Sequence, residues 1–193
     1  MSTQPKTHYT PEEYLALERA AEYKSEYFNG EIFAMSGASG QHVLIVTNLV
    51  LQLATQLKKR DCSVYSTDMR VKVNPAGLYT YPDVIVVCGE SQFSDAQMDT
   101  LINPNVIVEV LSESTQGYDR GGKFEQYRTL ESFKEYVLIA QDKLHVEHFA
   151  RQPDNRWLLS ETNRMEDSIE LTSIACTLAL AEIYDKVKFP DNK

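Results

Sequence analysis

Two short apolar runs, YPDVIVV at residues 81–87 and VIVEVLS at residues 106–112, decide the fold expected for this sequence. Both are rich in β-branched residues, the pattern of a strand buried on both faces. Each run carries one carboxylate, Asp83 at the start of the first and Glu109 in the middle of the second. A carboxylate in a buried strand is costly unless it is paired, hydrogen-bonded or bound to a metal. Two of them on neighbouring strands suggest one shared cation, and their hard oxygen ligands favour Mg²⁺.

Each carboxylate also has an ordinary structural explanation. Asp83 can cap a turn after Pro82, and Glu109 can pair with a buried arginine or lysine. The strand pattern alone leaves these alternatives open.

Length and composition are those of one domain. The chain has 193 residues, with 42% hydrophobic and 24% charged content, which is typical of a soluble globular protein. No apolar run approaches the roughly 20 residues that span a bilayer, and the N-terminus has no apolar signal core. We therefore expect a single domain over residues 1–193 that is cytoplasmic and not membrane-bound, with disorder near residues 1–8 and 187–193.

Charge and cysteine content narrow the classes of function. The net charge of −9 argues against a non-specific nucleic-acid coat, which needs a large basic surface, but it does not exclude a nuclease with an acidic metal site. The three cysteines are far apart and have no metal-binding spacing. Cys88 and Cys176 lie in apolar runs, so we expect both to be small core residues.

The remaining pattern predicts alternating helices and strands. The capping box TPEE at residues 10–13 predicts a helix to about residue 21, and Asn29-Gly30 predicts a hairpin over residues 23–35. Apolar spacing predicts a long helix over residues 41–59, opened by His42. Residues 74–77 should form a turn, and residues 89–104 a loop with a short helix. Further strands are expected at residues 62–65, 69–73, 133–140, 144–149, 157–160 and 169–171, with helices at about 119–130 and after residue 179.

The position two residues after Glu109 bears on the chemistry. Side chains alternate along a strand, so Leu111 points the same way as Glu109. A metal-dependent nuclease of this design normally has a lysine there, beside the metal and the attacking water. The next helix offers a substitute, because Lys123 lies in its first turns and has a long stem. Lys123 can equally be a solvated helix lysine.

Several segments together resemble one known family. They are Tyr81-Pro82-Asp83-Val84, residues 108–112, Ser114-Thr115, Asp119-Arg120, Lys123 and Tyr127, with Asn29-Gly30-Glu31 and His42 in the same order. The set resembles the Uma-two family of restriction-endonuclease-like proteins, which is common in cyanobacteria and belongs to the PD-(D/E)XK nuclease superfamily. The resemblance covers about residues 9–180.

The resemblance implies an α/β fold with a restriction-endonuclease-like core, a central mixed sheet flanked by helices. Asp83 and Glu109 match metal-binding carboxylates for Mg²⁺ or Mn²⁺, and Lys123 matches a catalytic lysine moved from strand to helix. Glu31, His42, Asp119 and Tyr127 are weaker site candidates.

The implied activity is endonucleolytic hydrolysis of nucleic acid, with DNA as the expected substrate and a homodimer as the expected assembly. Two alternatives remain at this point. One is a non-catalytic module that binds nucleic acid or protein on a decayed nuclease core. The other is a structural homo-oligomer without a site, in which Asp83 and Glu109 form ion pairs with basic residues.

Overall fold

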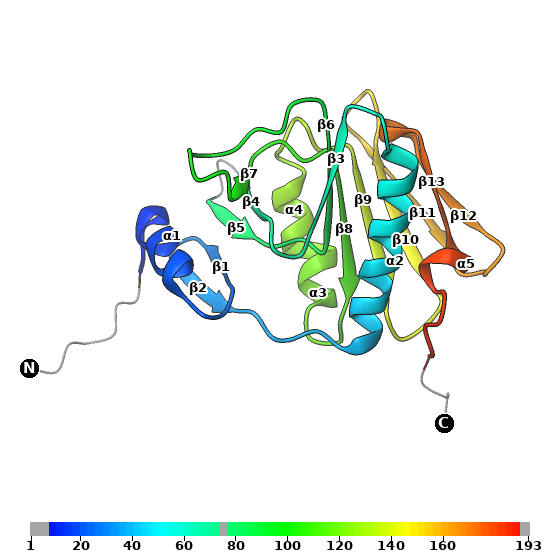
Figure 1. Cartoon of the computed structure of the whole chain (residues 1–193), viewed down its shortest axis with the longest axis horizontal. Coiled ribbons are helices and arrows are strands. Elements are labelled where there is room, and N and C mark those ends of the chain that lie inside the picture. The colour runs from blue at the N-terminus through cyan, green and yellow to red at the C-terminus, as the bar shows by residue number, and fades with distance from the viewer. Residues whose placement is uncertain (1–7, 74–76, 190–193) are drawn as a thin grey trace, which may run out of the picture.

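The fold is built on two β-sheets with helices against their faces, as the computed structural model in Figure 1 shows. The structure describes residues 8–73 and 77–189. The larger sheet has the strand order β11-β10-β9-β8-β6-β3, and the smaller has the order β2-β1-β5-β4-β7. In the larger sheet β8 runs parallel to β9 and antiparallel to β6, so the sheet is mixed, as the family resemblance implies.

The strands of the larger sheet are β3 (Cys62–Ser66), β6 (Val84–Cys88), β8 (Val106–Leu111), β9 (Glu135–Ala140), β10 (Val146–Arg151) and β11 (Trp157–Thr162). Those of the smaller sheet are β1 (Ser25–Phe28), β2 (Glu31–Ala34), β4 (Arg70–Val73), β5 (Leu78–Thr80) and β7 (Thr100–Leu101). A separate hairpin joins β12 (Ser168–Leu171) to β13 (Cys176–Ala179). The helical segments are α1 (Pro11–Ala20), α2 (Gly40–Leu57), α3 (Gln116–Tyr118), a π-helical turn (Asp119–Lys123), α4 (Phe124–Tyr127), a 3-10 turn (Thr172–Ile174) and α5 (Leu180–Ile183).

Helix α2 covers one face of the larger sheet, and the segment from α3 to α4 covers the other (Figure 1). Strand β8 shows how the sequence produces this layering. Val106, Val108 and Val110 pack in the cluster under α2, whereas Ile107 and Leu111 pack in the cluster under α4. Alternation along the strand therefore places Glu109 on the α4 face.

A third, smaller cluster holds the N-terminal helix and hairpin together. Tyr14, Tyr27 and Tyr79 are buried and have ring centroids 5.1 to 5.8 Å apart. The predicted caps and turn are present: Glu13 N donates to Thr10 Oγ1 at 3.3 Å in α1, and β1 and β2 are joined at Asn29-Gly30. Both turn residues have positive φ, 48° and 89°, as a type I′ hairpin turn requires.

Two local predictions were wrong. Residues 89–104 contain no helix; they form a loop that pairs β7 with β4 and bridges Phe93 to Leu101, because backbone pairing across the smaller sheet satisfies this polar segment. The helix expected at 119–130 begins earlier, at Gln116, and contains a π-helical turn.

Cys88 is not the buried core thiol that we expected. It is half-buried and forms a disulfide with Cys62, its register partner across β3 and β6, whereas Cys176 is buried and free. Disulfides are rare in cytosolic proteins, so this bond does not support the cytoplasmic expectation. Among residues 8–73 and 77–189, no helix has both the length and the apolar character needed to cross a membrane.

Two further predictions fall largely outside the described residues. Most of the turn expected at residues 74–77 cannot be compared, and neither can most of the disorder expected at the two termini. Within the described residues, Val187 and Phe189 pack against the core, and the Phe189 ring lies 5.3 Å from that of Tyr184.

Candidate active site

Glu109 is the buried centre of the candidate site. Only 4% of the residue is exposed. Its Oε1 accepts hydrogen bonds from the hydroxyl of Tyr127 at 2.9 Å and from Nζ of Lys123 at 3.2 Å. Its Oε2 accepts a longer one, 3.3 Å, from the backbone N–H of Asp83. Each of these three hydrogen bonds therefore involves a residue that the sequence placed in the site.

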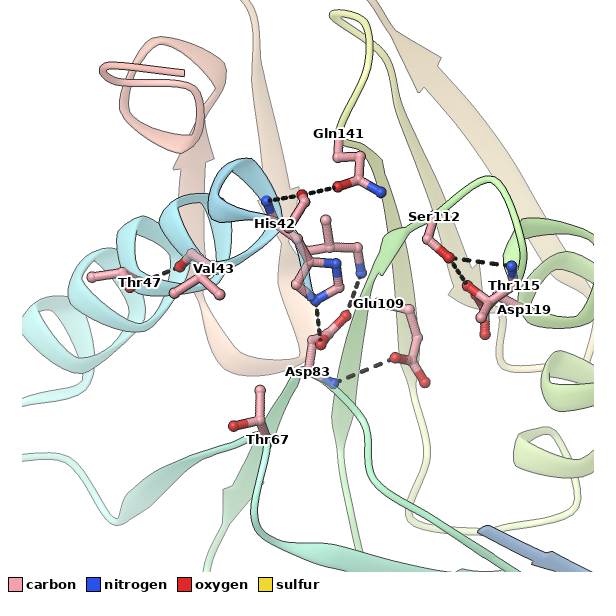
Figure 2. A network of polar contacts seen from close by, with 12 residues as sticks. His42, Val43, Thr47, Thr67, Asp83, Glu109, Ser112, Thr115, Asp119 and Gln141 are labelled. Atoms are coloured by element: carbon pink, nitrogen blue, oxygen red, sulfur yellow. Dashed lines mark hydrogen bonds and ion pairs between the residues drawn. The ribbon is translucent and has the colours of Figure 1, made fainter. Parts of the chain in front are cut away.

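Asp83 lies immediately before β6, at the end of the sheet, and its side chain is held from the α2 side. Its Oδ1 is 2.8 Å from Nε2 of His42, and its Oδ2 accepts from the backbone N–H of Val110 at 2.7 Å (Figure 2). His42 is presented by the first turn of α2, where Ser39 caps the helix. Asp83 and Glu109 are thus neighbours joined through a backbone N–H, but each carboxylate has its own set of partners.

Lys123 lies on the α4 side of this pair and is buried, with 6% of the residue exposed. The π-helical turn directs both Asp119 and Lys123 inward. The ammonium is 3.2 Å from Glu109, 3.2 Å from Glu26 and 3.3 Å from Asp119. Burial alone would lower the pKa of Lys123, but the three carboxylates raise it well above its ordinary value, so the group is an ammonium.

Leu111 explains why the lysine comes from the helix. It is the strand position that carries the lysine in the usual nuclease pattern, and here it is 4% exposed and packs in the apolar cluster under α4. An ammonium cannot replace it there without being buried among apolar side chains. The cation instead reaches Glu109 from the helical segment above the sheet.

The site has an excess of acidic groups. Glu109, Glu26 and Asp119 place three carboxyl groups around one lysine ammonium, and Asp83 adds a fourth beside Glu109. Burial raises the pKa of Glu109 to about 8; the Lys123 charge opposes the shift, and the negative charges of Asp119, Asp83 and Glu26 add to it. Burial likewise raises the pKa of Asp119 against the opposing charge of Lys123. The cluster therefore favours taking up positive charge, as a proton or as a metal ion.

Glu26 was missed by the sequence analysis, and Glu31 was chosen in its place. Glu31 is exposed on the edge strand β2, and in the described part of the chain it is not among the contacts that join the other candidates. Glu26 lies on β1 between β2 and β5 and accepts a hydrogen bond from Thr80. Glu26 could have been identified as a site residue from its place on the strand after α1. Its two neighbours on that strand, Ser25 and Tyr27, are buried.

The donor set fits a hard divalent cation. Asp83 and Glu109 offer carboxylate oxygens, the ligands that Mg²⁺ and Mn²⁺ prefer, and the surplus of negative charge is what such an ion would neutralise. Within the described residues, the group of three potential ligands whose donor atoms all lie within 4.8 Å of one another is a different one, formed by His145, Glu147 and Glu161. There Arg120 already donates two hydrogen bonds, at 2.8 and 2.7 Å, to the Glu147 oxygen nearest the histidine.

The fold and this site define a restriction-endonuclease-like α/β protein. A solved structure supports the fold: the crystal structure of a putative nuclease belonging to DUF820 from Anabaena variabilis has a TM-score of 0.77 and 19% sequence identity, and the match covers 93% of this chain and 99% of that one. The sequence itself matches the Uma2 family, described as "Putative restriction endonuclease", over residues 11–181. This chain belongs to the Uma2 family.

Two relatives from Synechocystis sp. extend the match. The uncharacterized protein sll1609 is 38% identical over 163 residues, which is 84% of this chain and 92% of the relative. The uncharacterized protein slr1290 is 34% identical over 180 residues, 93% of each chain. The resemblance inferred from the motifs is therefore confirmed.

Proposed function

We propose that this chain is a metal-dependent endonuclease that hydrolyses phosphodiester bonds in nucleic acid, with DNA as the expected substrate. The observation that carries the proposal is the meeting of Asp83, Glu109 and Lys123 at one end of the larger sheet, with Lys123 Nζ 3.2 Å from Glu109. Membership of a family described as "Putative restriction endonuclease" supports the same reaction class.

In the proposed mechanism, Asp83 and Glu109 would hold Mg²⁺ or Mn²⁺, which lowers the pKa of a bound water and polarises the phosphate. The ammonium of Lys123 orients the attacking water or stabilises the charge that grows on the phosphoryl oxygens. Its three carboxylate neighbours fix its direction in a buried environment. Tyr127 and His42 position the two metal-binding carboxylates: Tyr127 hydrogen-bonds Glu109, and His42 contacts Asp83.

The direct test is cleavage of a mixed panel of single- and double-stranded DNA and RNA with Mg²⁺, with Mn²⁺ and with a chelator. We expect cleavage that needs the divalent cation and is abolished in Asp83→Asn. Asp142→Asn removes an exposed carboxylate from the turn between β9 and β10 and should leave activity unchanged. Calorimetric titration should show metal binding to the wild type and its loss in Asp83→Asn.

A protein that binds nucleic acid but cleaves none of the panel with either metal would refute the nuclease proposal. It would favour the non-catalytic module, for which Leu111 in the usual lysine position is the motive. We also propose a two-fold homodimer, since closed two-fold symmetry is the commonest assembly. Light scattering that finds only monomer at micromolar concentration would contradict the dimer without bearing on cleavage.

A further inference from the structure

A hollow of about 720 Å³ lies at the end of α4 and is bounded by the β10–β11 hairpin. Its basic residues are Arg128, Lys134 and Arg151, and its aromatic residue is Trp157. The volume is in the range of ligand sites and is far larger than a free phosphate needs. The hollow shares no residue with the candidate active site, although both lie on the α4 face of the larger sheet.

The three cations of the hollow are unusual because no ion pair in the described part of the chain involves them. Most other arginines have a carboxylate partner there, for example Arg19, Arg70, Arg120 and Arg164. Lys134 instead donates to the backbone oxygen of Glu131 at 2.7 Å, and Arg151 donates to the backbone oxygen of Arg128. Arg128 packs over the Phe124 ring and the charge of Glu131 acts on Arg151, but none of the three cations forms a direct ion pair among the described residues. In a chain of net charge −9, such cations suggest an external anion.

Arg151 carries the strongest sign of a missing partner. Its guanidinium lies over the indole of Trp157, 5.0 Å from the ring centroid, which fixes its orientation. Its Nε is buried and has no hydrogen-bond partner among the described residues. A guanidinium held in this orientation can present its accessible donors to a phosphate oxygen. Glu125 and Glu131 also line the hollow, so the lining retains a net charge of one positive unit.

From these contacts, we propose that the hollow binds phosphates of the nucleic-acid strand that extends beyond the scissile bond. This inference rests on the proposed function. Arg128 follows Lys123 by five residues, a helical rise of about 7.5 Å. A duplex strand carries one phosphate roughly every 3.4 Å along its axis, so a duplex that runs parallel to α4 from the Lys123 end would bring about two further phosphates to the hollow. The indole edge supplies apolar contact for a sugar or base.

The test measures binding separately from cleavage. In the full-length Asp83→Asn protein, binding of duplex and single-stranded DNA is followed by emission of Trp157, the chain's one tryptophan, and by fluorescence anisotropy of labelled DNA. We expect Arg128→Ala/Lys134→Ala to bind about tenfold more weakly and to lower the slope of log Kd against log salt by about 1.8 for duplex DNA, or about 0.9 per lost phosphate contact. The control pair Lys58→Ala/Lys143→Ala removes two exposed lysines elsewhere and should leave the affinity and the slope close to those of the parent.

Kinetics separate this inference from the proposed function. With Asp83 intact, Arg128→Ala/Lys134→Ala should raise KM while kcat stays near the wild-type value. Salt-dependent binding through the hollow without cleavage would refute the nuclease proposal and support phosphate binding by the hollow. An unchanged affinity and salt slope in the double variant would refute phosphate binding by the hollow without bearing on the nuclease proposal. An equal loss in the control pair would do the same, and a wild type that binds no nucleic acid would overturn both.

Discussion

Replacing Lys123 by methionine should separate metal binding, turnover and stability. Methionine keeps the length and apolar stem of lysine and removes only the ammonium. The metal-binding carboxylates remain, so we expect Mg²⁺ or Mn²⁺ to bind while cleavage falls to background. The stability of the folded state should fall as well, because Glu109, Glu26 and Asp119 lose the charge that lies 3.2 to 3.3 Å from each of them.

The magnitude follows from burial. At an effective dielectric constant of about 20, each of the three contacts is worth roughly 5 kcal/mol of attraction, and desolvation and carboxylate repulsion offset most of this sum. Removal of one partner from a buried ion cluster typically costs about 3–5 kcal/mol. For a chain of this length that loss corresponds to a decrease in Tm of about 10 °C.

The loss should depend on pH in a defined direction. The pKa of Glu109 is already raised to about 8 in the presence of Lys123, and without the ammonium it rises further. A carboxyl whose pKa is raised by folding contributes stability below its unfolded value of 4.5, and this contribution is lost as the pH rises through the folded value. The variant should therefore be closest to the wild type near pH 5 and fall increasingly below it towards pH 9.

The assay is urea unfolding at pH 5, 7 and 9, with and without Mg²⁺. Added Mg²⁺ should restore part of the stability, because a cation again neutralises the carboxylates. The double variant Lys123→Met/Glu109→Gln should recover stability at pH 9, and Lys143→Met is the exposed-lysine control. Equal stability of Lys123→Met and the wild type at all three pH values, or normal cleavage by Lys123→Met, would refute the reasoning.

Three further predictions concern other contacts. Glu26→Gln should lower kcat with little change in KM or in metal affinity, because it removes one of the carboxylates that position the ammonium; an unchanged kcat would make Glu26 a structural residue. Reduction of the Cys62–Cys88 disulfide, which has a sequence separation of 26, should cost roughly 3.5 kcal/mol of stability in urea unfolding, with Cys62→Ser/Cys88→Ser as the permanent equivalent. Arg19 hydrogen-bonds Asp99 and, against the smaller opposing effect of burial, lowers the pKa of Asp99 to about 2. The contribution of Asp99 to the stability of the folded state is therefore present above pH 4 and is lost as the pH falls through 2. Arg19→Ala should return the pKa of Asp99 towards 3.8 in an NMR titration.

Much of the fold could be read from local patterns. The β-branched runs around Asp83 and Glu109, the capping box at Thr10 and the Asn29-Gly30 turn are all formed by neighbours in sequence, so residue type and spacing determine them. The helix expected at residues 41–59 is α2, which ends at Leu57. These elements needed no knowledge of tertiary contacts.

Features set by tertiary contacts escaped prediction. The importance of Glu26 depends on Thr80, which is 54 residues away in sequence and brings β5 beside β1. The Cys62–Cys88 bond depends on the register of β3 against β6. The π-helical turn was not predicted because Asp119 and Lys123 fit an ordinary helix equally well, and such single turns depend on the tertiary environment of the helix.

The N-terminal hairpin makes the site conditional on the docking of a separate small cluster of the fold. Glu26 reaches Lys123 only while β1 is docked. Docking depends on the small cluster of Tyr14, Tyr27 and Tyr79, on the register pair of Tyr27 with Tyr79, and on polar contacts such as Arg19 with Asp99 and Tyr81 with Glu18. A segment docked through a small apolar cluster can open locally while the larger clusters stay folded. Each local opening would withdraw a carboxylate from the ammonium while both larger clusters stay intact. The fraction of molecules in which Lys123 has all three carboxylate neighbours is therefore set by a local opening equilibrium. Substitutions in α1, far from Glu109, should change activity without changing global stability.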